Sequence, residues 1–367
     1  MLQSETITTA RSESGNGICP LIISDADTVR RYCPSFRHLL FGFEAQDISS
    51  AMVVPPASEI ESFLFPRVRI VEHPVLKFPF FFFQNHRHLL SSLEKIKPSL
   101  VHCYGTAKAP LASSVAAHFD IPAVITIDSA RFSIRSKMTI NKNFNKILVP
   151  SNRLTEKLTQ RGLSLEKISQ VNIGTFADES CCCYSDTDRL PSMLVLGNFD
   201  RFSDYEPLLG AIRHLNVDGY EFLVIFMGSG PAETQIRNFI KSTGLIQTVT
   251  VTPLIRPLRE VFRGCDVFIH PCSFGDFDPA LIETAAAGLA IAADKDNAEE
   301  FLQDGSTSVL FDGNDELSIY SVLQKLLDDK LFARSIASAA QNYLRSNNSV
   351  SSMVNELLKI YESAKQH

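Results

Sequence analysis

The strongest constraint on the fold is an alternation of short β-branched runs with helical patterns along almost the whole chain. Strands and helices in this order form parallel sheets that are covered by helices. The alternation stops at one polar stretch and then restarts, so we predict an α/β protein with two halves and a cleft between them. The expected strands are residues 21–23, 50–54, 100–103, 123–127, 146–149 and 168–171 in the first half, and 193–196, 222–226, 249–251, 267–269, 289–292 and 309–311 in the second.

The polar stretch that divides the chain is the best candidate for an interdomain linker. A length of 367 residues also suits two domains better than one. We predict a disordered tail at residues 1–17, an N-terminal domain at 18–176, the linker at 177–191 and a C-terminal domain at 192–345. Residues 346–367 carry apolar positions at helical spacing, and we expect them to form a helix that packs across the domains.

Charge and cysteine usage exclude several classes of protein. The net charge of -6 leaves no broad basic surface for nucleic acid, so we expect no nucleic-acid partner. The eight cysteines lack paired spacing, which favours a reduced, cytoplasmic setting. The run Cys181 to Cys183 has no nearby His or fourth thiol to complete a metal site, so we expect no bound metal and an inert linker.

The N-terminal residues are polar and lack the apolar segment of a secretory signal, and no run approaches the about 20 apolar residues that cross a bilayer. The aromatic run Phe78 to Phe83 is followed by His86, Arg87 and His88. It fits either a buried edge of the first domain or peripheral contact with a membrane or a lipid-linked acceptor. The expected location is cytoplasmic, with the inner face of a membrane as the alternative.

Residues 265–311 combine a strand, a helix, a second strand and a second helix. Asp278 is a good N-cap, Pro279 suits the first helical position and Gly288 is a C-terminal stop, which predicts a helix over residues 279–287. The amides at its start, residues 280–282, would favour a phosphate or carboxylate. Glu283 lies one turn further on, within reach of a ribose hydroxyl. The alternative interpretation is an ordinary helix start with a solvated glutamate.

Glycines follow the neighbouring strands of the second half. Gly197 ends one strand, while Gly228 and Gly230 follow the next. Glycine at the carboxyl end of a strand allows a ligand to approach the backbone. Together with the loop at residues 273–275, these positions predict one ligand-facing rim on the second domain.

The order of these segments resembles that of the family 4 glycosyltransferases. The similar segments of the second half are MLVLGNF, FLVIFMGSGPAETQIRNF, PLREVFRGCDVFIHPCSFGDFDPALIETAAAGLAIAA and EEFLQDG. The first half is similar more loosely, through LVHCYGTAKAPLASSVAAHFDIPAVITID and KILVPSNRLTEKL. The resemblance implies a GT-B fold, in which two Rossmann-like domains with parallel sheets face an interdomain cleft.

The resemblance also implies an activity. The C-terminal domain would bind a nucleoside-diphosphate sugar, and the N-terminal domain would dock a glycan, a lipid-linked molecule or a small molecule as acceptor. A hexosyltransferase of this kind retains the anomeric configuration and needs neither a metal ion nor a cofactor besides the donor. Its main task is to stabilise charge on the leaving diphosphate.

The resemblance implies donor contacts at the loops and helix start of the second domain. Glu283 would hold the ribose, the Ala280 and Leu281 amides would hold the diphosphate, and Asp276 would contact the sugar. The expected donor-site residues are Gly197, Arg201, Gly228, Gly230, Phe274, Gly275, Pro279, Ala280, Leu281 and Glu283.

Several positions depart from the family pattern. Gly275 stands where the first glutamate of the E-x(7)-E pair is expected, with Asp276 beside it. Asn198 stands at the position of the usual arginine, and no lysine follows. Arg201 is the cation left in that loop, and Arg256 is a more distant candidate.

The acceptor side is also altered, because Ile23, Ser24 and Asp25 follow the first strand without a glycine. Asp128 stands where the family often has a histidine, and His102 lies near the end of its strand. We take Asp128, Asp276 and His102 as candidate catalytic residues, with a hydrogen-bonded structural role as the alternative for His102.

Two other functions remain open. The missing charges fit a catalytically inactive GT-B protein that serves as partner or regulator of an active transferase. A nucleotide-sugar epimerase on the same fold is the third option, although His270 alone does not support it.

Overall fold

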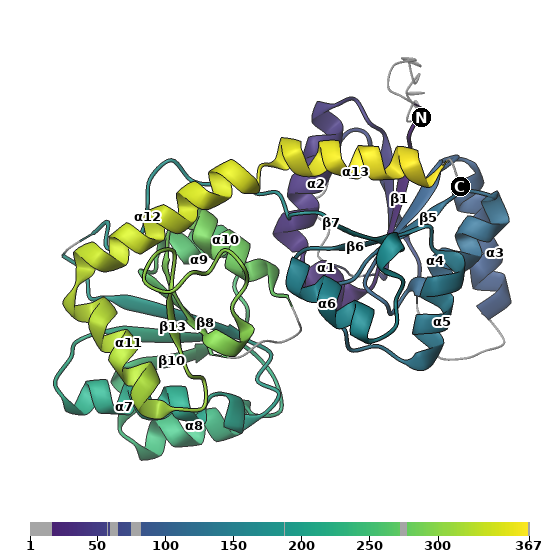
Figure 1. Ribbon diagram of the computed structural model, residues 1–367. Helices are drawn as coiled ribbons and strands as arrows, with labels where there is room; N and C mark the ends of the chain where they lie inside the picture. The colour runs from purple at the N-terminus through teal and green to yellow at the C-terminus, as the bar shows by residue number, and fades with distance from the viewer. Residues whose placement is uncertain are drawn as a thin grey trace, which may run out of the picture.

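The N-terminal domain is a parallel sheet covered by helices on both faces (Figure 1). The computed structural model describes residues 17–56, 58, 65–74, 82–186, 188–271 and 277–365. The strand order is β3-β2-β1-β4-β5-β6-β7. The strands are β1 (Pro20–Ser24), β2 (Ser50–Val54), β3 (Val68–Glu72), β4 (Leu100–Tyr104), β5 (Ala123–Thr126), β6 (Lys146–Val149) and β7 (Ile168–Gln170), and the helices are α1 (Ala26–Arg31), α2 (Cys33–Ala45), α3 (Phe82–Glu94), α4 (Ala109–Phe119), α5 (Ile134–Asn143) and α6 (Asn152–Gln160).

The C-terminal domain repeats this architecture with the strand order β10-β9-β8-β11-β12-β13. All of its strand pairs are parallel. The strands are β8 (Ser192–Gly197), β9 (Leu223–Gly228), β10 (Val249–Thr252), β11 (Val267–His270), β12 (Ala290–Asp294) and β13 (Val309–Phe311), and the helices are α7 (Glu206–Val217), α8 (Glu233–Ser242), α9 (Leu258–Arg263), α10 (Pro279–Ala287), α11 (Glu316–Asp328) and α12 (Lys330–Asn347).

The two sheets confirm the predicted fold class, and each candidate strand of the sequence is present. The prediction missed β3, an edge strand in which no residue is fully buried. Its charged positions Arg69 and Glu72 interrupt the apolar run that marks a strand buried on both faces. In each sheet the chain reverses its direction of winding beside the first strand, and open α/β sheets bind ligands at the carboxyl ends of the strands there.

Part of the predicted linker, residues 181–184, packs closely on the C-terminal domain. The side chains of Cys181, Cys182 and Cys183 are buried, and the Cys181 thiol donates a hydrogen bond to the Gly288 carbonyl at 3.1 Å. A Cβ on Gly288 would lie 2.8 Å from the Cys181 Cα. Within the described ranges, no group of three or more His, Cys, Asp or Glu side chains could hold a metal ion.

The C-terminal helices connect the two domains (Figure 1). Helix α12 packs against α10, and α13 (Val350–Ala364) then crosses to the N-terminal domain and packs against α2. The contact is close, since a Cβ on Gly42 would lie 2.6 Å from a methyl group of Val354. Of the helices in the described part of the chain, none is long and apolar enough to cross a membrane.

Buried His102 fixes α13 to the sheet of the N-terminal domain. Its Nδ1 lies 2.6 Å from the Tyr361 hydroxyl, and its Nε2 lies 2.7 Å from the Thr126 hydroxyl. Burial lowers the pKa of His102 to about 3. The ring is therefore neutral at physiological pH and serves as a hydrogen-bonding group of the core.

We predict that Tyr361→Phe lowers the free energy of unfolding by about 1–3 kcal/mol, because it leaves a ring nitrogen of His102 buried without its partner. Chemical denaturation measures the change. Tyr343→Phe is the matched control and should change stability by less than about 0.5 kcal/mol, since Tyr343 is on the surface. Equal effects of the two substitutions would contradict the role given to this hydrogen bond.

The depressed pKa of His102 also predicts a pH dependence of stability. Between about pH 6.5 and 3 the unfolded chain binds a proton at this residue and the folded chain does not, so acidification destabilises the fold. The contribution is present above about pH 6.5 and is lost at up to about 1.4 kcal/mol per pH unit as the pH falls. Denaturation of His102→Gln from pH 4 to 6.5 should show a flatter dependence than wild type, whereas exposed His118→Gln should not.

Candidate functional site

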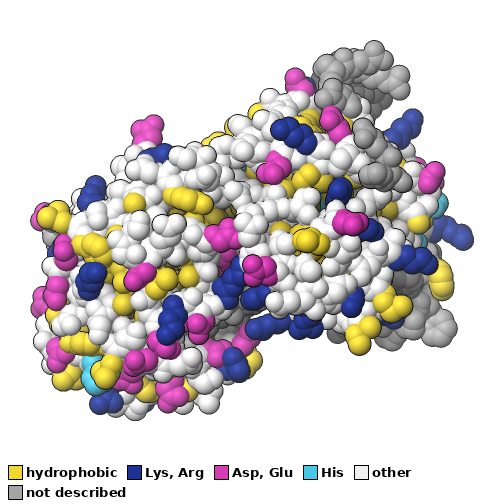
Figure 2. Space-filling model, viewed as in Figure 1, with side chains coloured by type: hydrophobic (Ala, Val, Ile, Leu, Met, Phe, Trp, Pro, Cys, Tyr) yellow, Lys and Arg dark blue, Asp and Glu magenta, His cyan; other side chains and the backbone are white. Residues whose placement is uncertain are grey.

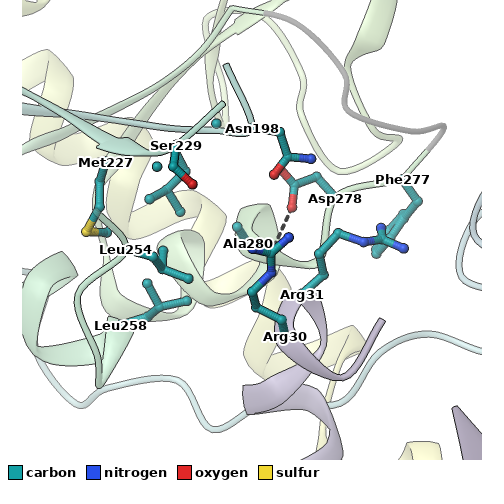
Figure 3. A pocket seen from close by; sticks show the side chains of 13 residues that line it. Arg30, Arg31, Asn198, Met227, Ser229, Leu254, Leu258, Phe277, Asp278 and Ala280 are labelled. Carbon is teal, nitrogen blue, oxygen red and sulfur yellow. Dashed lines mark hydrogen bonds between the residues drawn. The ribbon is translucent and has the colours of Figure 1, made fainter. Parts of the chain in front are cut away.

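A cavity lies between the domains, at the carboxyl ends of β8 and β9 and opposite α1 (Figure 3). One side of it is apolar, and Met227, Leu254 and Leu258 lie there. The other side is polar and charged. Its lining consists of Arg30 and Arg31 from α1, together with Leu196, Gly197, Asn198, Met227, Gly228, Ser229, Leu254, Leu258, Phe277, Asp278 and Ala280 from the C-terminal domain.

The structure places two glycines of the predicted rim at the cavity, and close backbone contacts explain the glycine at two of the rim positions. Gly197 and Gly228 are paired across β8 and β9 and both line the cavity. A Cβ on Gly228 would lie 1.8 Å from the Gly197 carbonyl oxygen, and one on Gly230 would lie 1.9 Å from that of Asn198. Gly230 itself lies outside the lining. These glycines allow the two loops to pack together and so shape the wall of the cavity.

Helix α10 begins and ends at the predicted residues. The Asp278 carboxylate caps it by accepting a hydrogen bond from the Ala280 amide at 3.0 Å, and Gly288 ends it in the left-handed conformation. The Leu281 amide donates to the Asp278 carbonyl at 3.2 Å. The Ala280 and Leu281 amides, which were expected to favour a phosphate, are therefore already paired with the N-cap residue. Pro279 and Leu281 are buried.

Asp278 places a negative charge at the start of α10. Burial alone would raise its pKa, but nearby His270, the Ala280 amide and Arg31 hold the pKa of Asp278 below its usual range. The Nε2 atom of His270 lies 3.4 Å from the Asp278 carboxylate. An anionic ligand at this position therefore requires a compensating positive charge.

That positive charge comes from the opposite domain. The Arg31 guanidinium forms an ion pair with Asp128, with 2.7 Å between Nη2 and Oδ2. Burial disfavours the charged guanidinium, but Asp128, Tyr32 and Asp278 together raise the pKa of Arg31. Arg30 pairs with Asp27 at 3.1 Å, and its side chain is 45% exposed.

The cations predicted from the sequence lie elsewhere. The Arg201 side chain is 76% exposed and binds Asp204 through Nη2 at 2.8 Å and Nε at 3.2 Å. Arg201 is not among the described residues that line the cavity. Arg256 donates from Nη2 to the Arg30 carbonyl at 2.7 Å, so it contacts the backbone of α1 across the domain boundary.

Glu283 lies in a neighbouring interdomain pocket that shares Leu258 with the cavity. Its carboxylate accepts a hydrogen bond from the Thr175 hydroxyl at 2.9 Å and lies 3.5 Å from both His38 Nδ1 and Arg259 Nη2. Burial lowers the pKa of His38, although Glu283 opposes this. Glu283 thus connects α10 to α2 and to the chain segment before the linker, and it does not line the cavity.

Of the three candidate catalytic residues, the structure describes Asp128 and His102, and neither of these two lines the cavity. Asp128 is buried and orients Arg31, whereas His102 lies in the core and bonds Tyr361. Phe274, Gly275 and Asp276 lie outside the described residues, as do residues 78–81 of the aromatic run. Arg30 and Arg31, which line the cavity, were not among the residues predicted from the sequence. Two adjacent arginines in the helix after the first strand could have indicated them. That helix begins at the carboxyl end of the strand, which is the edge of the sheet where ligands bind.

Charged side chains also lie on the surface around the hollow between the two lobes. Figure 2 shows Lys and Arg side chains on both sides of the hollow between the two lobes, with acidic side chains among them. The cleft therefore combines both signs of charge.

Comparison with known proteins identifies the class of the C-terminal domain. Residues 187–343 match the family described as glycosyl transferases group 1. Comparison with curated proteins gives no match. The C-terminal domain is thus similar to this family, and the two domains together have a GT-B-type architecture.

Solved structures share the fold over nearly the whole chain. A glycosyltransferase from Rickettsia africae has a TM-score of 0.77 and 15% identity, over 95% of this chain and 99% of that one. Anabaena HepE in complex with UDP-glucose has a TM-score of 0.77 and 12% identity, over 94% and 99%. Sucrose-phosphate synthase from Thermosynechococcus elongatus has a TM-score of 0.73 and 17% identity, over 94% and 98%.

We predict that Gly228→Ala destabilises the protein by about 2 kcal/mol or more, because the new methyl group would overlap the Gly197 carbonyl. Gly264→Ala is the control, since its Cβ would approach the nearest atom no closer than 3.3 Å and its φ of -84° suits any residue. Thermal and chemical unfolding of both variants tests the prediction. Similar stabilities would show that the β8 and β9 ends adjust freely.

Proposed function

We propose that the chain is a glycosyltransferase that binds a nucleoside-diphosphate sugar in the cavity between the domains. The observation that carries the proposal is the division of the cavity, at the ligand-binding edge of a group 1 domain, into an apolar side and a charged side. The base and ribose would lie against Met227, Leu254 and Leu258. The diphosphate would lie toward Asn198 and the arginines of α1.

The proposed reaction is the transfer of the sugar to an acceptor hydroxyl with retention of configuration. The bond between the anomeric carbon and the diphosphate oxygen breaks, the acceptor oxygen bonds to that carbon, and the acceptor proton passes to the leaving diphosphate. Stabilisation of charge on the diphosphate is the main catalytic requirement, and the proposed reaction uses no metal ion. A hexose is the proposed sugar, and a glycan, lipid-linked or small-molecule acceptor would approach from the N-terminal domain.

Uridine is the first base to test, because HepE was solved with UDP and with UDP-glucose. The likeness to HepE supports this choice only through the shared fold. GDP and ADP complete the panel of candidate nucleotides.

We predict that one of UDP, GDP and ADP stabilises the protein by about 2.7 kcal/mol when present at 100 times its dissociation constant. Leu254→Asp should weaken this binding about tenfold or more, because it places an acidic group on the apolar wall. Leu254 is 37% exposed, so the variant should fold, and Ile246→Asp, at a residue 58% exposed and outside the lining, is the matched control. Calorimetry and thermal unfolding measure both effects, and a lack of response to all three nucleotides would refute the donor site.

A non-enzymatic role is the second candidate. It is favoured by Asn198 at a position where an arginine was expected and by the paired amides at the start of α10. A protein that binds a nucleotide but neither hydrolyses nor transfers the sugar of the corresponding sugar nucleotide would support a partner or regulatory role.

A further inference from the structure

We propose that Arg30 and Arg31 of the N-terminal domain bind the diphosphate of the donor, in place of cations on the C-terminal domain. The inference rests on the proposed function and names the residues that would neutralise the leaving group. It assigns one half of the donor site to the opposite domain.

The charges in the lining carry the first step of the argument. Arg30 and Arg31 are the cations among the described lining residues, and Asp278 is the anion. The C-terminal wall contributes neutral Asn198 at the β8 end. Arg201 pairs with Asp204 and is not among the described residues that line the cavity. A diphosphate in this cavity therefore meets its counter-charge only on α1, within the described residues.

The second step is the paired state of the first two amides of α10. The Ala280 and Leu281 amides donate to Asp278, so they cannot also bind a phosphate without breaking the cap. The Asp278 carboxylate would also repel a diphosphate. Two guanidinium groups in the lining of the same cavity can offset that repulsion, and guanidinium groups suit the geometry of phosphate oxygens.

The third step is the way α1 is held. Asp128 forms an ion pair with the Arg31 guanidinium, and Arg256 of the C-terminal domain donates a hydrogen bond to the Arg30 carbonyl. The end of α1 is thereby held at the domain boundary by groups of both domains. Preorganised cations stabilise developing charge more effectively than groups that must first reorient. Asp128 is accordingly a positioning residue for Arg31.

The test compares a nucleoside diphosphate with its own nucleoside, using whichever of UDP, GDP and ADP stabilises the wild type most. Arg30→Gln should weaken diphosphate binding about tenfold or more, because hydrogen bonds to charged groups are among the stronger polar contacts. Affinity for the nucleoside, measured by ligand-observed NMR, should not change. Arg30 is 45% exposed, so this variant should fold. Arg161→Gln, at an exposed residue remote from the lining, is the matched control.

Arg31 requires a double variant, because its removal alone would leave the buried Asp128 carboxylate unpaired. Arg31→Gln with Asp128→Asn should lower diphosphate affinity about tenfold and leave nucleoside affinity unchanged. Arg201→Gln gives the competing result: if it weakens diphosphate binding while Arg30→Gln does not, the inference is overturned and the site lies on the β8 loop.

The two proposals fail in different ways. If none of the three diphosphates binds the wild type, the donor site and the arginine assignment are both refuted. If a diphosphate binds equally well to wild type, to Arg30→Gln and to the double variant, only the arginine assignment is refuted. A loss of nucleoside affinity in parallel with diphosphate affinity would indicate a structural effect on the cavity and would also overturn the assignment.

Discussion

The position of Arg31 between two carboxylates determines much of the electrostatics of the cleft. Asp128 belongs to the N-terminal domain and Asp278 to the C-terminal domain, and both raise the pKa of Arg31. A partly buried guanidinium in this position reduces the repulsion between the two acids. It also keeps a cation at the point where the ligand-binding edges of the two sheets face each other. The cleft thus has a built-in charge arrangement that an anionic ligand can use.

Asp278 illustrates a conflict between folding and binding. An acidic N-cap stabilises α10, because it accepts a backbone hydrogen bond and lies at the positive end of the helix. The same carboxylate occupies the end of the helix that would otherwise favour a phosphate. The start of helix α10 lines the cavity, and the helix packs on α12. Its stability therefore affects both the cavity and the packing of the domain. A cationic pair from the opposite domain resolves the conflict without loss of the cap.

Local signals account for what the sequence predicted well. The bounds of α10 follow from Asp278, Pro279 and Gly288, and each of these acts within one turn of the helix. Apolar β-branched runs likewise revealed the buried strands, whereas the half-exposed edge strand β3 lacked that pattern. The roles of side chains depended on distant partners. His102 bonds Tyr361 from 259 residues away, and Glu283 bonds Thr175 from 108 residues away. The spacing of residues along the sequence does not indicate which distant residues form such pairs.

The relative placement of the domains is specified by contacts on several sides of the cleft. Glu283 of the C-terminal domain contacts Thr175 and His38. Arg256 contacts the Arg30 backbone. Helix α12 packs on α10, and α13 packs on α2 of the other domain. A ligand that contacts both walls of the cleft shifts the domains toward this arrangement only by the difference between its affinity for this arrangement and its affinity for a more open one. Because these contacts join the domains at several points, they favour one arrangement of the two walls of the cleft. A cation on α1 therefore lines the same cavity as the C-terminal residues, and in the proposed donor site it would act with them although it belongs to the other domain.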